Sequence, residues 1–299
     1  MDDIQKLIKS LEQEITETTE DILKEDMLLR LQSVAKTYNG KDRVVSSFEI
    51  LEDIKNQPPQ KKILTGIAGL DNILDGFRLG QLVILSGITK HGKTSMAIEL
   101  TIRLKEENPL WFPFEEPATE LILKFHERNQ PPPLFYTPLT IINGTLLWIE
   151  KKIIEAKVKH NAQIVFIDHL HFLTKPSQNM AQEIGALVRE IKKLAVKWKV
   201  VIFLLAHLRK TQLDKNPDFE DLKDSSSIAQ EADTVIFIWR ETKRENGEIQ
   251  ITNKTNLSVQ ANRKTGKTGN VKMIYENGRF RECDWTHNEE IEKKDDWKF

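Results

Sequence analysis

The stretch GITKHGKTS, residues 87–95, has the spacing of a loop that cradles phosphates. Its two glycines let backbone N–H groups converge on phosphate oxygens, Lys93 can reach the β- and γ-phosphates, and the Thr94 hydroxyl can hold Mg²⁺. The apolar run LVIL precedes the loop, as a strand would. The pattern therefore predicts a site for a nucleoside triphosphate and Mg²⁺ formed by Gly87, Ile88, Thr89, Lys90, His91, Gly92, Lys93, Thr94 and Ser95.

Acidic and imidazole side chains stand at the ends of three further apolar runs, where they could complete a hydrolase. Asp168 closes QIVFID and could hold the magnesium ion, because the carboxyl ends of parallel strands lie at one edge of a sheet. Glu115 or Glu116 follows LWFPF, and either carboxylate could polarise the attacking water. His207 follows VVIFLLA and could sense the γ-phosphate, although a histidine at a strand end is more often structural.

The apolar runs predict an α/β fold in which strands and helices alternate from about residue 63. Near-continuous runs favour a mostly parallel sheet covered on both faces, with strands at 82–86, 110–114, 163–168, 200–206 and 234–240. Helices are predicted after Pro117 and over 93–106, 144–159 and 179–198. The segments LSVQANR, NVKMIYE and RFREC, joined by glycine-containing turns, predict an antiparallel extension.

The N-terminal part, residues 1–60, predicts a helical appendage and a linker. Ser46 and Glu49 form a capping-box pattern that predicts a helix over 47–56, followed by the extended pair Pro58-Pro59. The main domain is expected over 61–285 and a charged, flexible tail over 286–299. Upstream, an apolar stripe predicts a helix that packs on its own domain or on a partner through Ile4, Ile8, Leu11, Ile15, Thr18 and Ile22.

The composition excludes several classes of protein. The chain of 299 residues holds 44 Lys+Arg and 45 Asp+Glu, so its net charge argues neither for nor against a nucleic-acid partner. The single cysteine, Cys283, rules out an intramolecular disulfide and a cysteine-rich zinc site. No apolar run reaches ~18 residues and no signal-peptide pattern is present, so we expect no membrane contact and a cytoplasmic protein.

Four longer segments resemble the sequence of a known protein family beyond the phosphate loop. LTGIAGLDNILDGFRLGQLVILSGITKHGKTSMA leads into that loop, IVFIDHLHFL has the form of a Walker B strand, and QANRKTGKTGNV is a basic hairpin. DLKDSSSIAQEADTVIFIWRE, residues 221–241, follows the pattern Asp-Leu-Arg-Glu-Ser-Gly-Ser-Ile, an acidic turn, and an apolar strand that ends in Arg. Over about 45 to 285 the chain therefore resembles DnaB-type replicative helicases, a branch of the RecA-like ATPases.

The resemblance implies a RecA-like P-loop NTPase that hydrolyses ATP as a ring, usually a hexamer, on single-stranded DNA. Glu115 would be the catalytic glutamate, and Arg263 would be the finger that reaches the ATP of the neighbouring subunit. The DNA-binding residues would be Lys223, Asp224 and Ser226, with Arg209 and Lys210 as further candidates. A primase or a loader would be the expected protein partner.

Several positions depart from the family pattern. The family has Gln where His207 stands, Lys where Ala261 stands and Gly where Ser226 stands, and residues 1–40 replace its N-terminal helical domain. The first interpretation is a DnaB-like motor in DNA replication. The alternative is a nucleotide-gated scaffold or loader that hydrolyses ATP without unwinding DNA. A recombinase-like filament is disfavoured by the 221–241 pattern.

Overall fold

A computed structural model of the chain describes residues 9–10, 13, 24–25, 27–32, 40, 43–128, 131–142, 144–173, 180–207, 217, 226–245 and 248–283. It divides into two units, Met1–Pro59 and Gln60–Phe299. The predicted N-terminal apolar stripe and the 286–299 tail lie outside the described residues. None of the described helices is both long enough and apolar enough to cross a bilayer.

Helix α3 (Ser47–Asn56), in the first unit, has the predicted bounds and the predicted cap. The Ser46 hydroxyl accepts a hydrogen bond from the Glu49 backbone N–H at 3.2 Å, and the Glu49 carboxylate accepts one in return from the Ser46 backbone N–H. No residue of α3 is buried. The helix therefore presents its apolar side chains to solvent, and these are Phe48, Ile50, Leu51 and Ile54.

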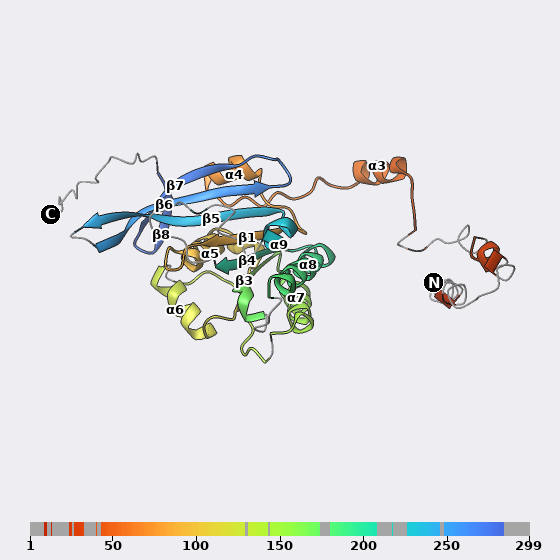
Figure 1. Ribbon diagram of the computed structural model, residues 1–299, viewed down its shortest axis with the longest axis horizontal. Coiled ribbons are helices and arrows are strands. Elements are labelled where there is room, and N and C mark those ends of the chain that lie inside the picture. Colours follow the sequence, from red (N-terminus) through yellow and green to blue (C-terminus); the bar gives the residue numbers. More distant parts are fainter. Residues whose placement is uncertain are drawn as a thin grey trace. The chain divides into compact units, whose positions relative to one another are not determined.

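In the second unit, one sheet contains eight strands of the described chain in the order β2-β3-β4-β1-β5-β6-β7-β8 (Figure 1). The first five positions pair in parallel and are filled by β2 (Leu110–Pro113), β3 (Ile164–Asp168), β4 (Val201–His207), β1 (Leu82–Gly87) and β5 (Thr234–Glu245). The antiparallel extension consists of β6 (Glu248–Asn262), β7 (Gly269–Glu276) and β8 (Arg279–Glu282). The predicted fold class, mostly parallel with an antiparallel C-terminal extension, is confirmed.

Helices cover both faces of the parallel strands, which explains why most residues in the central part of those strands are apolar and buried. One face packs against α4 (Ala68–Leu74), α5 (Lys93–Arg103) and α6 (Ala118–Arg128). The other packs against α7 (Leu146–His160), α8 (Met180–Trp198) and α9 (Ser226–Glu231). Short 3-10 turns follow α5 at Lys105–Glu107 and β3 at Leu170–Leu173.

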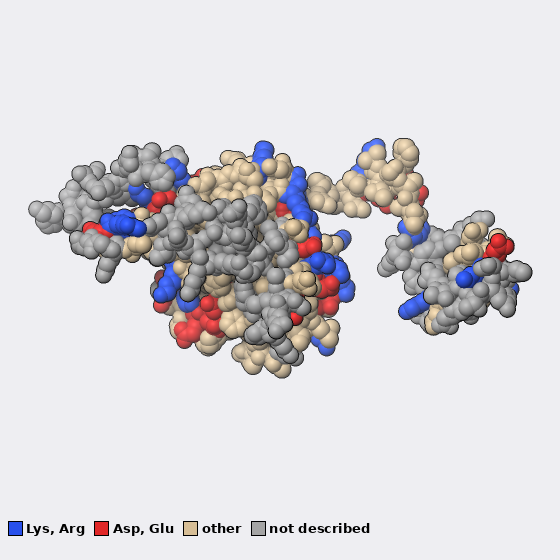
Figure 2. Space-filling model, viewed as in Figure 1, with Lys and Arg blue, Asp and Glu red and all other residues tan. Residues whose placement is uncertain are grey.

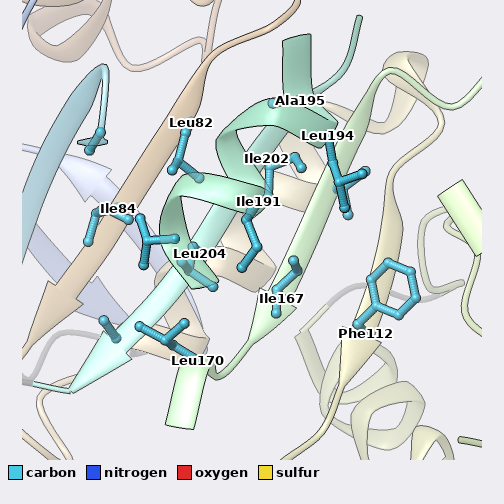
Figure 3. Close-up of a cluster of buried hydrophobic side chains, with 14 of the residues drawn as sticks. Leu82, Ile84, Phe112, Ile167, Leu170, Ile191, Leu194, Ala195, Ile202 and Leu204 are labelled. Atoms are coloured by element: carbon cyan, nitrogen blue, oxygen red, sulfur yellow. The ribbon is translucent and has the colours of Figure 1, made fainter. Parts of the chain in front are cut away.

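Alternate residues of each central strand enter different cores. Leu82 and Ile84 of β1 face the α7–α8 side, whereas Val83 and Leu85 face the α4–α5 side. Figure 3 shows the first of these cores, in which side chains of four neighbouring strands meet Ile191, Leu194 and Ala195 of α8. The two apolar layers hold the strands rigidly, so the edge at which they end is a fixed platform.

The structure differs from the sequence prediction in short or polar elements. Helices α4 and α9, of 7 and 6 residues, were not predicted because such short helices show too little apolar periodicity. Strands β5 and β6 continue as a paired hairpin through the polar segment after Arg240, where backbone pairing is supplemented by side-chain hydrogen bonds such as that from Asn256 Nδ2 to Glu241 Oε1. Helix α5 ends at Arg103 rather than at 106.

Glu99, whose side chain is fully buried, joins α5 to the last strand. Its carboxylate accepts hydrogen bonds from Arg279 Nε and Arg103 Nε, both at 2.7 Å, and from the Phe280 backbone N–H at 3.3 Å. Burial raises the pKa of Glu99, but the hydrogen bonds from Arg279 and Arg103 outweigh it and hold the pKa below the ordinary 4.5. The helix that follows the phosphate loop is therefore anchored to the antiparallel extension.

Replacing Glu99 with Ala should lower the free energy of unfolding by about 2 to 3 kcal/mol near neutral pH, because two arginines lose their shared carboxylate. Since the folded pKa lies below the unfolded one, this stabilisation is present above the unfolded pKa and is lost as the pH falls through the folded pKa. Urea unfolding of the wild type and the variant should therefore show a difference that shrinks below pH 4.5.

Glu155→Ala is the matched control, because Glu155 pairs with Lys152 and Lys159 on an exposed surface of α7. Its loss should lower the free energy of unfolding much less than the loss of Glu99 does, because solvent screens exposed ion pairs. Equal losses for the two variants would contradict the anchoring role of Glu99.

Candidate functional site

The predicted phosphate-loop, acidic and histidine residues lie where four neighbouring strands end. Gly87, the last residue of β1, is level with His207, the last residue of β4. Asp168, the last residue of β3, is level with Leu205 of β4 and with Pro113 of β2. Because all these strands are parallel, their carboxyl ends form one edge, and the structure brings the predicted residues together there.

The loop of residues 87–95 connects β1 to α5 as predicted, with Lys93 as the first residue of the helix. Gly92 has φ +102°, a conformation that favours glycine. Gly87 is needed for a second reason, because an added Cβ would lie 2.1 Å from the backbone oxygen of Ile238 on β5. The loop therefore presents backbone N–H groups at a helix N-terminus, the arrangement that binds phosphate.

Lys93 is buried at the centre of this edge. Its Nζ donates to the Gly87 carbonyl oxygen at 3.1 Å and lies 2.9 Å from His207 Nδ1. Burial lowers the pKa of Lys93 to about 8, although the charges of Asp168 and Glu115 oppose that shift. The ammonium group is thus held by polar atoms next to the phosphate loop, and a bound phosphate would attract it away from these partners.

Thr94 and Asp168 form the candidate magnesium pair. The Thr94 hydroxyl donates to Asp168 Oδ2 at 3.0 Å. Asp168 is only 4% exposed, and burial raises its pKa to about 6, with a further contribution from the charge of Glu115. A hydroxyl and a carboxylate that already adjoin each other are ligands that Mg²⁺ prefers, and a bound cation would offset the cost of burying the carboxylate.

Glu115 and Glu116 have different partners. The Glu115 backbone N–H donates to the Asp168 carbonyl oxygen at 3.1 Å, and its side chain lies beside Lys93 and Asp168 closely enough to shift the pKa of both. Glu116 instead forms an ion pair with Lys124 of α6. The Glu115 side chain is 47% exposed and that of Glu116 is 17% exposed. Of the two carboxylates, that of Glu115 faces the phosphate-loop lysine.

His169 belongs to the same group, although the sequence analysis assigned it no role. Its Nδ1 lies 3.1 Å from Glu115 Oε2, and its ring meets the His207 ring edge to face at 4.4 Å between centroids. Burial lowers the pKa of His169, while the hydrogen bond to Glu115 opposes that effect. Its position directly after the strand-ending Asp168 was the available signal, because that residue must also lie at the edge.

His91, within the phosphate loop, directs its side chain into the protein. It is fully buried, and its Nδ1 accepts a hydrogen bond from the Arg240 backbone N–H at 3.1 Å. Burial lowers the pKa of His91, so the neutral ring, whose Nδ1 can accept that hydrogen bond, is favoured. His91 therefore ties the loop to β5 through its side chain and contributes to the loop with its backbone.

Arg263 lies at the opposite edge of the sheet. It follows Asn262, the last residue of β6, which pairs with Thr234 at the start of β5. Its backbone N–H donates to the Asp233 carbonyl oxygen at 2.9 Å, and its guanidinium contacts the Gln230 carbonyl oxygen. Thr234 is level with Val83 of β1, four residues before Gly87. At about 3.3 Å per residue, Arg263 is separated from its own phosphate loop by at least about 13 Å.

The proposed DNA-binding residues are mostly beyond what the structure describes. Arg209, Lys210, Lys223 and Asp224 lie outside the described residues, and Ser226 is the first residue of α9. On the face shown in Figure 2, basic and acidic side chains lie beside one another over the described surface. Their mixture agrees with the nearly balanced charge of the chain.

The sequence matches known proteins over much of its length. Residues 138–282 match the family model described as DnaB-like helicase C terminal domain. The chain is 28% identical over 286 residues to the replicative DNA helicase DnaB of Rickettsia conorii, covering 75% of this chain and 57% of that protein. It is 25% identical over 273 residues to the Geobacillus stearothermophilus protein of the same name, covering 79% and 60%. The chain thus spans somewhat over half the length of these curated relatives.

Solved structures share the fold. The ATPase domain of G40P superposes with a TM-score of 0.65 at 20% identity, covering 79% of this chain and 97% of that domain. A DnaB-like replicative helicase, described with its interactions with primase, gives a TM-score of 0.64 at 20% identity, covering 93% and 76%. These similarities confirm the predicted RecA-like fold.

Proposed function

We propose that this chain, whose residues 138–282 match the model of the DnaB-like helicase C terminal domain, is an ATP-hydrolysing translocase that acts on single-stranded DNA as a ring of identical subunits. The observation that supports the proposal is the convergence of Lys93, Asp168 and Glu115 at one edge of the sheet. A binding module would need the loop and the lysine alone. Hydrolysis requires two further groups, and both are present: a buried acid beside the loop and a second acid that faces the same lysine.

Each side chain at this edge has a distinct task in hydrolysis. Lys93 leaves its contacts with Gly87 and His207 and neutralises charge on the β- and γ-phosphates. Thr94 and Asp168 would hold a magnesium ion, which would supply further charge neutralisation there when bound. Glu115 accepts a hydrogen bond from the attacking water and aligns it with the γ-phosphorus. His207 is released from Lys93 in the same rearrangement, so it can report whether a γ-phosphate is present.

The arginine finger must come from another subunit. Arg263 lies at the edge opposite its own phosphate loop, at least about 13 Å away along the strands, and both edges belong to one rigid sheet. A head-to-tail arrangement would bring this edge of one copy against the nucleotide edge of the next, and such heterologous contacts close into a ring when the rotation permits. The hexamer expected from the family resemblance is the arrangement we propose.

Helix α3 supports the same assembly. It exposes Phe48 by 77% and Ile54 by 61%, on a helix with no buried residue. Apolar side chains gathered on a capped, well-formed helix indicate a partner surface. We propose that α3 packs on the neighbouring subunit of the ring.

The DNA contact is proposed for the segment between His207 and Ser226. That segment leaves the nucleotide edge at His207 and contains Arg209, Lys210, Lys223 and Asp224. A rearrangement of His207 on ATP binding or hydrolysis would thereby reach the DNA. By analogy with the relative described with primase, a primase or a loader is the proposed protein partner.

Replacing Glu115 with Gln should lower kcat for ATP hydrolysis by about 10²- to 10⁴-fold, because an amide cannot polarise the attacking water. ATP binding should persist, since the loop and Lys93 are unchanged. Steady-state phosphate release and equilibrium binding of a fluorescent ATP analogue measure the two effects separately. Glu116→Gln, at the adjacent position, removes a carboxylate paired with Lys124 and should leave kcat close to the wild-type value. A larger loss in Glu116→Gln would reverse the assignment.

Subunit mixing tests the finger in trans. Arg263→Ala alone should reduce hydrolysis by about 10³- to 10⁵-fold, and Lys93→Ala should abolish it. In a random equal mixture, about a quarter of the interfaces join an intact phosphate loop to an intact Arg263, so activity should return. Hydrolysis that stays at the level of the separate variants, in a mixture shown by native mass spectrometry to contain both subunits, would contradict the head-to-tail ring.

A further inference from the structure

Among the residues that the structure describes, Glu115, His169 and His207 form a cluster of metal-ligating side chains. Each offers one ligand atom, and the three atoms lie within 4.8 Å of one another. From this geometry we propose that Glu115, His169 and His207 form a site for a divalent transition-metal ion of the zinc class, separate from the magnesium pair. The binding itself is independent of the proposed function, whereas its effect on catalysis rests on that function.

The donor set suits zinc rather than magnesium. Two imidazoles and one carboxylate leave a fourth position for water, as in zinc sites with three protein ligands. Zinc–nitrogen and zinc–oxygen distances of about 2.0–2.2 Å place ligand atoms about 3.4 Å apart in a tetrahedron. His169 Nδ1 and Glu115 Oε2 are already 3.1 Å apart. Side-chain adjustments of about 1 Å would close the remaining distances.

The three ligands project from a rigid platform. His207 is the last residue of β4, and His169 directly follows the last residue of the neighbouring strand β3. The backbone N–H of Glu115 is held by the Asp168 carbonyl oxygen. Little conformational entropy is therefore lost when the three side chains close on an ion, which favours binding.

Donor type separates the two metal positions. The magnesium pair, Thr94 and Asp168, offers oxygen atoms only. Mg²⁺ prefers oxygen ligands and gives up its waters reluctantly, so it should compete poorly for two imidazoles. A zinc-class ion, in contrast, gains affinity from His169 and His207.

Lys93 opposes this ion directly. Its Nζ lies 2.9 Å from His207 Nδ1, so an ion bound to His207 would meet a neighbouring positive charge. In the nucleotide-free protein, the metal ion and the Lys93 ammonium group therefore compete for His207, and this competition lowers the metal affinity. Removing that group should strengthen metal binding, an effect that an unspecific surface site would not show.

Metal binding at this cluster would remove the carboxylate that hydrolysis needs. An ion bound to Glu115 occupies the oxygen that would otherwise orient the attacking water, and it takes His207 away from the γ-phosphate. Zinc-class ions should thus inhibit ATP hydrolysis at saturating magnesium, and chelation should restore it. This step deepens the proposed function and depends on it.

Titration of the full, nucleotide-free chain with Co²⁺ and with Zn²⁺, in buffer containing excess Mg²⁺, tests the site. We expect one Co²⁺ per chain with the intense visible absorption of low-coordinate cobalt, and displacement of that ion by Zn²⁺. His169→Asn, His207→Gln and Glu115→Gln should each weaken binding by at least about tenfold. His126→Ala, which alters an exposed histidine of α6, should leave it unchanged. Lys93→Met should bind more tightly than the wild type.

Two results would overturn the proposal. One is an absorption spectrum and affinity that are the same in the wild type and in Glu115→Gln, whose exposed side chain can be changed without disturbing the core. The other is Lys93→Met binding no more tightly than the wild type. These measurements contain no ATP, so they test the metal site even if the chain has no ATPase activity. Conversely, a chain that hydrolyses ATP but does not bind cobalt would contradict the metal site and leave the proposed function intact.

Discussion

The parallel register of β1, β3 and β4 is the constraint on which the candidate site depends. It sets Gly87 level with His207, and Asp168 two residues behind His207 on the neighbouring strand. The phosphate loop, an acid and an imidazole therefore lie at one edge of the sheet, although they come from three segments that are far apart in the sequence. Apolar layers on both faces keep that register, since a shift by one residue would exchange the side chains of the two cores.

Charge burial is the cost that this arrangement imposes. The pKa of Lys93 falls to about 8 and that of Asp168 rises to about 6, in both cases chiefly through burial. In the nucleotide-free protein, the neighbouring charges and hydrogen bonds therefore do not fully offset the cost of burying the charged form of either group. A bound triphosphate with its cation would supply the missing countercharges, so the burial that destabilises the charged groups here would strengthen its binding. The arrangement of charges at this edge therefore favours ligand binding at the expense of the stability of the nucleotide-free protein.

Much of this edge could be predicted from sequence because it rests on strong local signals. The phosphate loop has fixed glycine and lysine spacing, and buried strands read as apolar runs whose last residues must meet at one edge. Glu115 and Glu116 could not be separated by residue type alone, because adjacent residues differ only in the direction of their side chains, which the ion pair between Glu116 and Lys124 now distinguishes. His169 was missed because its partner, Glu115, is distant in sequence. The position of Arg263 opposite its own loop follows from the antiparallel return of β6, a pairing that no local pattern gives.

If this edge is an ATPase centre coupled to single-stranded DNA, steady-state ATP hydrolysis should depend on whether single-stranded DNA is present. We expect DNA to stimulate hydrolysis, the stimulation to weaken as salt is raised because phosphate contacts release counterions, and Lys93→Ala to show no hydrolysis under any condition. Hydrolysis by the wild type that is the same with and without DNA at both low and high salt would contradict this coupling. That result would leave a nucleotide-gated scaffold as the better description of the chain.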